Sequence, residues 1–238
     1  MKPAQDRADV VPAHRRYLER AAELEGLDLR ERFAHIFRTN LWGSEESISG
    51  SGSALEQTAA IRAQLPVLLR ELKVASMLDL PCGDFGWMRA VDLSGVRYWG
   101  GDIVADLIER HQWEFGGTGR RFALLDLTRD PLPEVDLVFN RDCLVHLSSK
   151  HIWDAIKNLK SSGSRWLLTT TFPEHAENRD IEDGDWRLLN LERAPFHFPP
   201  PVAILNENCT EHGGAFADKS LGLWRIAELP DAPSIAPL

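Results

Sequence analysis

The stretch that decides the fold is residues 77–88, which read MLDLPCGDFGWM. A short apolar run ends in a tight turn with two glycines and two carboxylates, and an amphipathic segment follows. This pattern predicts a β-strand, a ligand-binding turn and a helix over Trp87–Asp92. In an open α/β sheet, a turn at the carboxyl end of the first strand is where a nucleotide-like cofactor sits, because small residues let the backbone approach the ligand closely.

Asp84 indicates which kind of nucleotide the turn accepts. A dinucleotide or a triphosphate needs a glycine-rich loop and a free helix amino terminus to hold phosphate, whereas Asp84 would place a carboxylate where that anion must lie. A cofactor with no phosphate and with a positive centre fits better. We therefore expect S-adenosylmethionine, a sulfonium, as the cofactor and S-adenosylhomocysteine as its product.

Polar residues also stand at the ends of the next three predicted strands. The second strand, Val96–Asp102, ends in a carboxylate 19 residues after Gly83, near the spacing of a ribose-binding acid. The third strand, Phe122–Leu127, closes on Asp126, where an adenine amino group could donate to it. The fourth, Val135–Asn140, runs directly into the polar segment 141–146, RDCLVH.

In this ordered set of motifs the chain resembles the class I S-adenosylmethionine-dependent methyltransferases, over about residues 75–226. Residues 79–84 stand as the first motif of that family, and Asp102, Asp126 and the segment after Asn140 stand as the next three. The resemblance implies a Rossmann-like α/β fold, with a seven-stranded, mostly parallel sheet, helices on both faces and an N-terminal helical extension. Residues 81–83 depart from the family pattern, since many members carry two or three small residues there.

A narrower resemblance concerns the acceptor. The Ser-rich segment before the core, the run from Asn140 to His146 and the Pro-rich strand near the end are similar to a bacterial group that includes sugar O-methyltransferases. Enzymes that methylate mannosides in mycobacterial polysaccharide synthesis are the nearest examples. We therefore expect a small carbohydrate as the acceptor.

The family resemblance carries over to a set of cofactor contacts at the strand ends. They are Asp79, Pro81, Cys82, Gly83, Asp102, Ile103, Asp126, Leu127, Asn140 and Arg141.

His146 is the candidate catalytic base. A sugar hydroxyl is a poor nucleophile and needs a base, and His146 follows the fourth strand on the rim where the methyl group must point. The alternative is a structural His held by hydrogen bonds. Asp142 is the second catalytic candidate, as a contact of the acceptor or of the methionyl amine, although Arg141 and Asp142 could instead be an ion pair that fixes the turn.

Candidate substrate contacts lie in irregular segments beside this site. An aromatic face can stack on a sugar ring, and acids, hydroxyls and imidazoles can bind its hydroxyls. These candidates are Trp42, Ser49, His175, Trp186 and Glu207. The Ser/Gly-rich segment 43–53 is either a lid or a connector. Several acids on one rim also permit a Mg²⁺ ion, although no ligand spacing demands one.

The chain divides into an N-terminal helical extension and lid (1–73), a cofactor-binding core (74–228) and a tail (229–238). Ser53 and Glu56 form a capping-box pattern, which predicts a helix from Ala54. Further helices are expected at 104–115 and 150–161. Later strands are expected at 165–171, 202–205 and 221–226, with the last two forming an antiparallel pair.

Composition excludes several classes of function. The formal net charge of the 238 residues is -9, which argues against a nucleic acid partner, because phosphate binding needs clustered Lys and Arg. With no signal-like or membrane-spanning run, we expect a soluble, cytoplasmic protein without a membrane partner. The three cysteines lack paired spacing and are expected to be free thiols. A homo-oligomer is compatible with the sequence.

Two other functions stay open. A nicotinamide-dependent oxidoreductase would use the same sheet, but Asp84 and the missing third glycine disfavour it. A non-catalytic homologue that keeps the cofactor pocket is the other alternative.

Overall fold

The structure, a computed structural model, describes residues 12–42, 46–117 and 119–233. Its centre is a seven-stranded sheet with the order β3-β2-β1-β4-β5-β7-β6. The strands are β1 (Ser76–Asp79), β2 (Arg97–Asp102), β3 (Arg120–Leu124), β4 (Leu137–Asn140), β5 (Trp166–Thr171), β6 (Ala203–Asn206) and β7 (Ser220–Arg225). The first five strands pair in parallel, and β7 runs antiparallel to both β5 and β6. The predicted sheet, with its last antiparallel pair, is confirmed.

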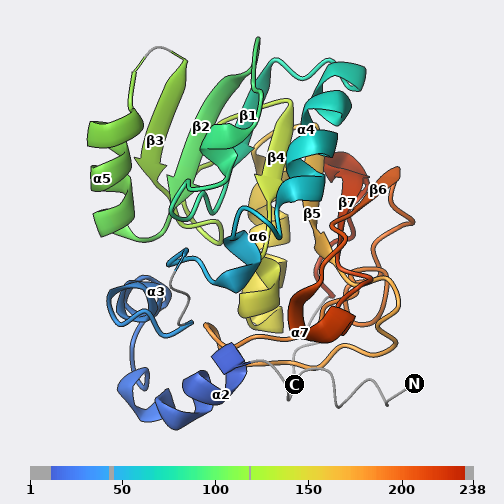
Figure 1. The fold of residues 1–238 in the computed structure, drawn as a ribbon. Helices are drawn as coiled ribbons and strands as arrows, with labels where there is room; N and C mark the ends of the chain where they lie inside the picture. Colours follow the sequence, from blue (N-terminus) through green and yellow to red (C-terminus); the bar gives the residue numbers. More distant parts are fainter. Residues whose placement is uncertain (1–11, 43–45, 118, 234–238) are drawn as a thin grey trace.

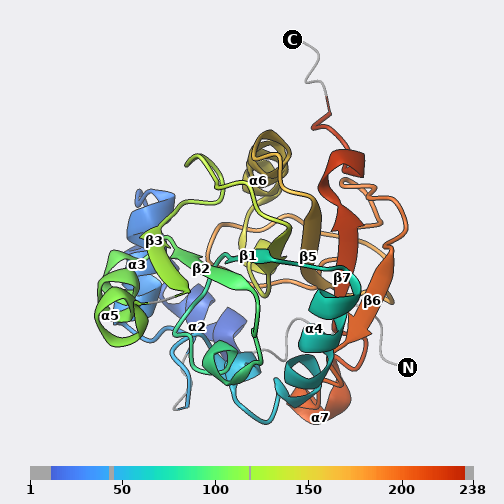
Figure 2. The same cartoon turned by 90° about the horizontal axis from the view of Figure 1, so that it is seen from above.

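Helices cover both faces of this sheet (Figures 1 and 2). Successive residues of a strand point to opposite faces, so both faces of the buried strands must be apolar. Met77 accordingly packs in one core with residues of α4 (Ala59–Glu71) and α5 (Ala105–Phe115), and Leu78 packs in another core with residues of α6 (Ser149–Ser161). Two hydrophobic cores therefore hold the sheet between them.

The connection between β1 and β2 differs from the prediction. The expected helix over Trp87–Asp92 is wrong, because the structure forms only a single 3-10 turn there, Met88–Ala90. Val91 is extended, and the carboxylate of Asp92 accepts hydrogen bonds from the backbone N–H and the hydroxyl of Ser94. This side-chain turn competes with helical hydrogen bonding and ends the helix after one turn.

The start of α4 also differs from the prediction. The helix begins at Ala59 and not at Ala54, because the Glu46 carboxylate accepts the N–H of Leu55 at 2.8 Å and the chain turns once more before the helix. The predicted Ser53–Glu56 capping box therefore does not start it. The helix continues through Pro66 to Glu71.

The described part of the N-terminal extension begins with two helices, α2 (Pro12–Glu19) and α3 (Leu29–Arg38). A capping box between Asp28 and Glu31 starts α3. Figure 1 shows both helices below the sheet, at the edge where the parallel strands end. The extension therefore lies against the edge that carries the predicted site.

Short elements complete the described part of the chain. They are 3-10 turns at Ala21–Glu23, Ser51–Ser53, Leu144–His146 and Ile226–Glu228, and α7 at Glu211–Gly214. Among the described residues, no helix combines the length and the apolar character needed to cross a bilayer. Residues 234–238 of the predicted tail lie outside the described residues.

Close packing of the central strands yields a first test. A Cβ atom added to Gly222 on β7 would lie 2.2 Å from the ring of Trp224. Gly222→Ala should therefore lower the free energy of unfolding by about 1–3 kcal/mol, because overpacking forces side chains out of their preferred rotamers. Urea denaturation measures the change. Ile204→Val, at the β6 position paired with Gly222 but 47% exposed, is the matched control. Equal effects of the two variants would contradict this account.

Candidate active site

Two adjoining cavities open at the carboxyl ends of the parallel strands. The first encloses about 1080 Å³ of free space, part of it open to solvent. Residues that follow β1, β2, β3 and β4 form one wall, and the apolar face of α3 forms the other. The predicted cofactor contacts on this wall are Asp79, Pro81, Cys82, Gly83, Asp102, Ile103, Asp126, Leu127 and Arg141.

Asn140 is the predicted cofactor contact that does not line this cavity. It is fully buried, where its amide donates to the Leu80 carbonyl at 2.5 Å and accepts from the Thr169 hydroxyl at 2.9 Å. Asn140 thus ties the end of β4 to Leu80, directly after β1, and to Thr169 on β5.

The turn after β1 is held tightly against Asp102. The backbone N–H of Gly83 donates to one oxygen of Asp102 at 3.1 Å, and that of Val104 donates to the other at 3.0 Å. Gly83 has a φ of 52°, and a Cβ there would lie 2.5 Å from the Ser49 hydroxyl oxygen. Only glycine suits this position, because other residues would meet both backbone strain and a clash.

Asp84 anchors the Ser/Gly-rich segment on this turn. Its carboxylate accepts from the Ser47 hydroxyl at 2.6 Å, and its backbone N–H donates to the Ser49 hydroxyl at 3.0 Å. Residues 46–53 therefore dock beside the first cavity, and Ser49, a predicted substrate contact, is among the residues that line it. Residues 43–45 of the predicted lid lie outside the described residues.

The first cavity is strongly acidic. Five carboxylates and one guanidinium line it, those of Asp79, Asp84, Asp102, Asp126, Asp142 and Arg141. Burial raises the pKa of Asp79 to about 8, although a 2.6 Å hydrogen bond from the Tyr98 hydroxyl partly opposes the shift. Burial likewise raises the pKa of Asp102 to about 6, against the stabilising backbone N–H donors. Such a site favours a ligand that brings positive charge.

The second cavity adjoins the first and encloses about 1060 Å³ of free space, part of it open to solvent. Four residues line both cavities, namely Trp42, Ser49, Asp142 and His146. The predicted contact Trp186 lines the second cavity, where it packs edge-on against Phe172 and Phe216. A ligand in one cavity would therefore meet a ligand in the other at these four side chains.

His146 stands at that junction with a defined protonation pattern. Its Nδ1 atom lies 2.7 Å from the backbone carbonyl oxygen of Asp185, which can only accept, so Nδ1 carries the proton. Burial lowers the pKa of His146 more than the nearby charges of Asp142 and Asp185 raise it. The ring is therefore neutral at pH 7, with Nε2 as its proton acceptor. Trp42 stacks on the imidazole at 4.5 Å between ring centroids.

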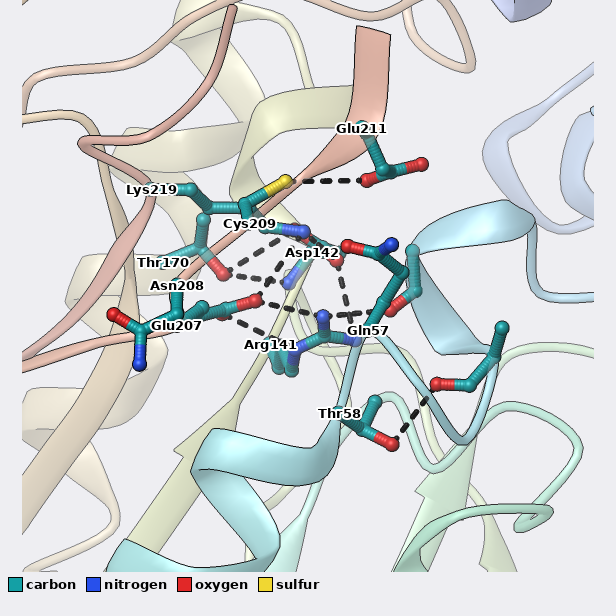
Figure 3. Close-up of polar contacts among 12 residues, drawn as sticks. Gln57, Thr58, Arg141, Asp142, Thr170, Glu207, Asn208, Cys209, Glu211 and Lys219 are labelled. Atoms are coloured by element: carbon teal, nitrogen blue, oxygen red, sulfur yellow. Dashed lines mark hydrogen bonds and ion pairs between the residues drawn. The ribbon is translucent and has the colours of Figure 1, made fainter. Parts of the chain in front are cut away.

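Asp142 belongs to a buried network of ion pairs (Figure 3). Its carboxylate accepts from Lys219 Nζ at 2.7 Å and lies 3.3 Å from Arg141 Nη1. Burial alone would raise the pKa of Asp142, but the charges of Lys219 and Arg141 outweigh burial and hold it below its usual range. Asp142 is thus a permanent anion, and its φ of 51° shows a strained backbone.

Glu207 is the fourth member of this network. It lies 2.8 Å from Arg141 and 3.5 Å from Lys219, and its side chain is 1% exposed. Arg141 also donates to the Gly52 carbonyl at 2.8 Å, which links the network to the Ser/Gly-rich segment. Glu207, a predicted substrate contact, lines neither cavity, whereas its partner Arg141 lines the first and its partner Lys219 lines the second.

His175 is the other predicted substrate contact outside both cavities. It is buried, and its backbone carbonyl accepts from the Asn190 amide at 2.9 Å. It lies in the irregular segment after β5 and lines neither cavity.

Sequence reasoning missed several residues that line the cavities. In the first cavity they are the apolar residues of α3, Leu29, Phe33, Ile36 and Phe37, and in the second they include Arg16, Phe172, Phe216 and Lys219. The α3 residues recur at helical spacing, which indicates an apolar face but not the surface that this face meets. Lys219 directly precedes β7, and no local pattern distinguishes it from a surface lysine.

The acidic residues at the strand ends, all within the described part of the chain, form no cluster of the kind that the sequence permitted for a Mg²⁺ ion. Within residues 12–42, 46–117 and 119–233, no group of three or more His, Cys, Asp or Glu side chains is placed to hold a metal ion.

Comparisons with known proteins support the fold. No protein-family model matches the chain, and no curated protein matches it. Among solved structures, the 1,6-didemethyltoxoflavin-N1-methyltransferase of Burkholderia thailandensis, with bound 1,6-didemethyltoxoflavin and S-adenosylhomocysteine, is similar with a TM-score of 0.55 and 16% identity, over 87% of this chain and 89% of that one.

A second similar structure is the methyltransferase domain of bacterial-CtHen1-C. It has a TM-score of 0.52 and 14% identity, over 72% of this chain and 98% of that one. Likeness at this level of identity establishes the fold. The chain has the Rossmann-like fold of the class I methyltransferases, as predicted.

The raised pKa of Asp79 yields a test of the acidic cavity. Asp79 ionises near pH 3.8 when exposed and near pH 8 when buried, so the unfolded state holds fewer protons between these values and stability falls as pH rises. Between pH 6.5 and 8 this group should lower the free energy of unfolding by up to about 1.4 kcal/mol per pH unit. Urea denaturation at several pH values measures the slope, which should flatten in Asp79→Asn. An unchanged slope in the variant would contradict the assignment.

Proposed function

We propose that this protein is an S-adenosylmethionine-dependent O-methyltransferase whose acceptor is a small sugar or oligosaccharide, such as a mannoside. One observation carries the proposal. An acidic cavity at the strand ends meets a second, aromatic-lined cavity at a neutral imidazole, His146, and a permanent carboxylate, Asp142. Donor and acceptor could thus meet beside a base.

The first cavity fits the cofactor by charge. A pyrophosphate would face the ionised acids among the five that line this cavity, whereas a sulfonium with an ammonium group would be attracted by them. In this proposal Asp102 accepts from the ribose hydroxyls, Asp126 from the adenine amino group, and Asp79 from the methionyl ammonium. When bound, the cofactor supplies a methyl group on a positively charged sulfur.

His146 acts as the general base. With Nδ1–H donated to the Asp185 carbonyl, Nε2 is the atom that takes the hydroxyl proton of the acceptor as the methyl group is transferred. A positioned base typically contributes about 10²–10⁴-fold to the rate. Asp142 stays ionised, so its role is electrostatic: it stabilises the imidazolium that forms and orients an acceptor hydroxyl.

The second cavity suits a neutral, polyhydroxylated acceptor. Its aromatic side chains, among them Trp42 and Trp186, offer apolar faces of the kind that pack on sugar rings. The charged residues there balance in number, with Arg16 and Lys219 against Asp142 and Glu211. These charges therefore give the cavity no excess of either sign that a ligand would have to neutralise. The same polar side chains can form hydrogen bonds with the hydroxyl groups of a neutral ligand.

The N-terminal extension (1–73) serves in this proposal as a wall and cover over the core (74–228). The apolar face of α3 lines the first cavity, where it would shield the nucleoside from water. The free thiols of Cys82, Cys143 and Cys209 fit a reducing compartment such as the cytoplasm.

The cofactor assignment is tested by Asp102→Asn. Loss of a charge-assisted acceptor should weaken S-adenosylhomocysteine binding roughly 10- to 100-fold, since hydrogen bonds to charged groups contribute about 1.5–3 kcal/mol. Titration calorimetry measures the affinity, and circular dichroism checks the fold. NAD titrated into the wild-type protein is the competing ligand. Binding of NAD in place of S-adenosylhomocysteine would favour the oxidoreductase and refute the proposal, as would unchanged affinity in the variant.

The catalytic assignment is tested by His146→Ala. Transfer of labelled methyl groups to a panel of mannosides, other sugars and non-sugar alcohols identifies the acceptor. With that acceptor saturating, kcat should fall about 10²–10⁴-fold in the variant, because the base is lost. Affinity for S-adenosylhomocysteine should stay within a factor of about three, since each tenfold change needs about 1.4 kcal/mol and His146 carries no cofactor contact in this proposal. A rate near that of wild type would place the base elsewhere.

A further inference from the structure

The loop that orients the His146 imidazole comes from a distant part of the chain. We call residues 183–187 the latch loop. Its Gly184 N–H donates to the His146 carbonyl at 2.8 Å, and its Asp185 carbonyl accepts the Nδ1 proton of the same residue at 2.7 Å. His146 is therefore bonded to the latch loop through both its backbone and its ring.

The latch loop is in turn bonded to α2 of the N-terminal extension. Nδ1 of His14 lies 2.6 Å from Oδ1 of Asp185, and the two side chains are 12% and 9% exposed. The Asp185 backbone thus orients one imidazole while its carboxylate is held by another, 171 residues away in sequence. Water has little access to compete for this short contact.

The rest of the extension fits the same loop. Arg32 donates to the Asp183 carbonyl at 3.1 Å and to the Tyr17 hydroxyl at 3.0 Å. Gly184 has a φ of 88°, and a Cβ there would lie 2.6 Å from Cδ1 of Ile36 on α3. The latch loop is therefore shaped to receive both helices at close range.

The extension also contacts the face of the His146 ring, through Trp42. Arg16 on α2 donates to the carbonyls of Leu41, at 2.8 Å, and of Trp42. Trp42 in turn stacks on the imidazole with an angle of 26° between the planes. One segment of the chain thus fixes the face of the ring through Trp42 and the hydrogen bond of the ring through Asp185.

We propose that His14 is a positioning residue for methyl transfer, which holds Asp185 so that its carbonyl keeps Nε2 of His146 aimed at the junction of the two cavities. This inference rests on the proposed function of His146. Without the His14 contact, the Asp185 carboxylate loses its buried partner, while the backbone bonds from Gly184 to His146 and from Arg187 to Val145 remain. The Asp185 carbonyl is then held less firmly as the acceptor that sets the orientation and tautomer of the imidazole. Rate depends steeply on such alignment, because a misplacement of about 1 Å can cost on the order of 10²-fold.

The chain offers a matched control. His35 on α3 belongs to the same extension and also pairs with a carboxylate, Glu23, at 2.9 Å, but that pair is exposed and lines neither cavity. His14→Ala removes the donor to Asp185. His14→Asn places an amide N–H near the position of Nδ1 and should restore the contact.

The kinetic experiment compares His14→Ala, His14→Asn and the control His35→Ala, each with the acceptor found for the wild-type protein. His14→Ala should lower kcat roughly 10- to 100-fold, as expected for a misaligned base. Binding of S-adenosylhomocysteine, measured by calorimetry, should remain within a factor of about three, because His14 lines no part of the cofactor cavity. His14→Asn should recover most of the rate, and His35→Ala should match wild type. The proposal is overturned if His35→Ala lowers kcat as much as His14→Ala does, or if His14→Ala does not lower kcat.

A second measurement does not depend on methyl transfer. Nitrogen-15 correlation spectra of the histidine rings report the tautomer and the pKa of His146, whose signal is assigned by its absence in His146→Gln. In wild type and His14→Asn the ring should be the Nδ1–H tautomer; in His14→Ala this preference should be lost and the pKa should rise toward its ordinary value as water enters. An identical tautomer and pKa in His14→Ala overturns the positioning role. If no acceptor is methylated but the spectra change as expected, the proposed function fails while the His14–Asp185–His146 connection stands.

Discussion

Burial of carboxyl groups at one edge of a parallel sheet is the constraint on which the rest of this structure depends. Because β1 and β2 end side by side, Asp79 and Asp102 face the same enclosed space, and the turn at Gly83 closes over them. Removing carboxylates from water is costly unless a partner compensates, which is why the pKa values of both groups rise. A ligand with positive charge beside these carboxyl groups would favour their ionised form and oppose the effect of burial.

In the neighbouring ion network, positive side chains compensate the buried carboxylates. Asp142 and Glu207 are stabilised inside the protein by Arg141 and Lys219. Removing one member of such a group leaves an uncompensated buried charge, so the four residues depend on one another. Their arrangement keeps a carboxylate ionised beside a neutral imidazole, His146, without transferring a proton between them. A fixed anion and an available base can therefore stand together at the junction of the cavities.

Local patterns predicted the elements around the site better than the elements that cover it. The strands and the acids at their ends were predictable, because apolar runs such as residues 77–80 and the turn residues after them lie together in sequence. The helix over Trp87–Asp92 was predicted wrongly, since the hydrogen bonds from Ser94 to Asp92 outweigh a weak helical pattern. Asn140 was predicted at the right strand end, but packing turned its side chain toward Leu80 and Thr169.

The sequence by itself determined the sheet, the strand-end carboxylates and the requirement for glycine at position 83, because strand periodicity and turn chemistry act over a few residues. Only the tertiary structure decided that His14 reaches Asp185, that Trp42 covers His146 and that Lys219 neutralises Asp142. Each of these pairs joins segments far apart in the chain, and their approach follows from the packing of α2 and α3 against the latch loop and of β7 beside β5. Such contacts depend on how whole elements pack together, which no short stretch of sequence encodes.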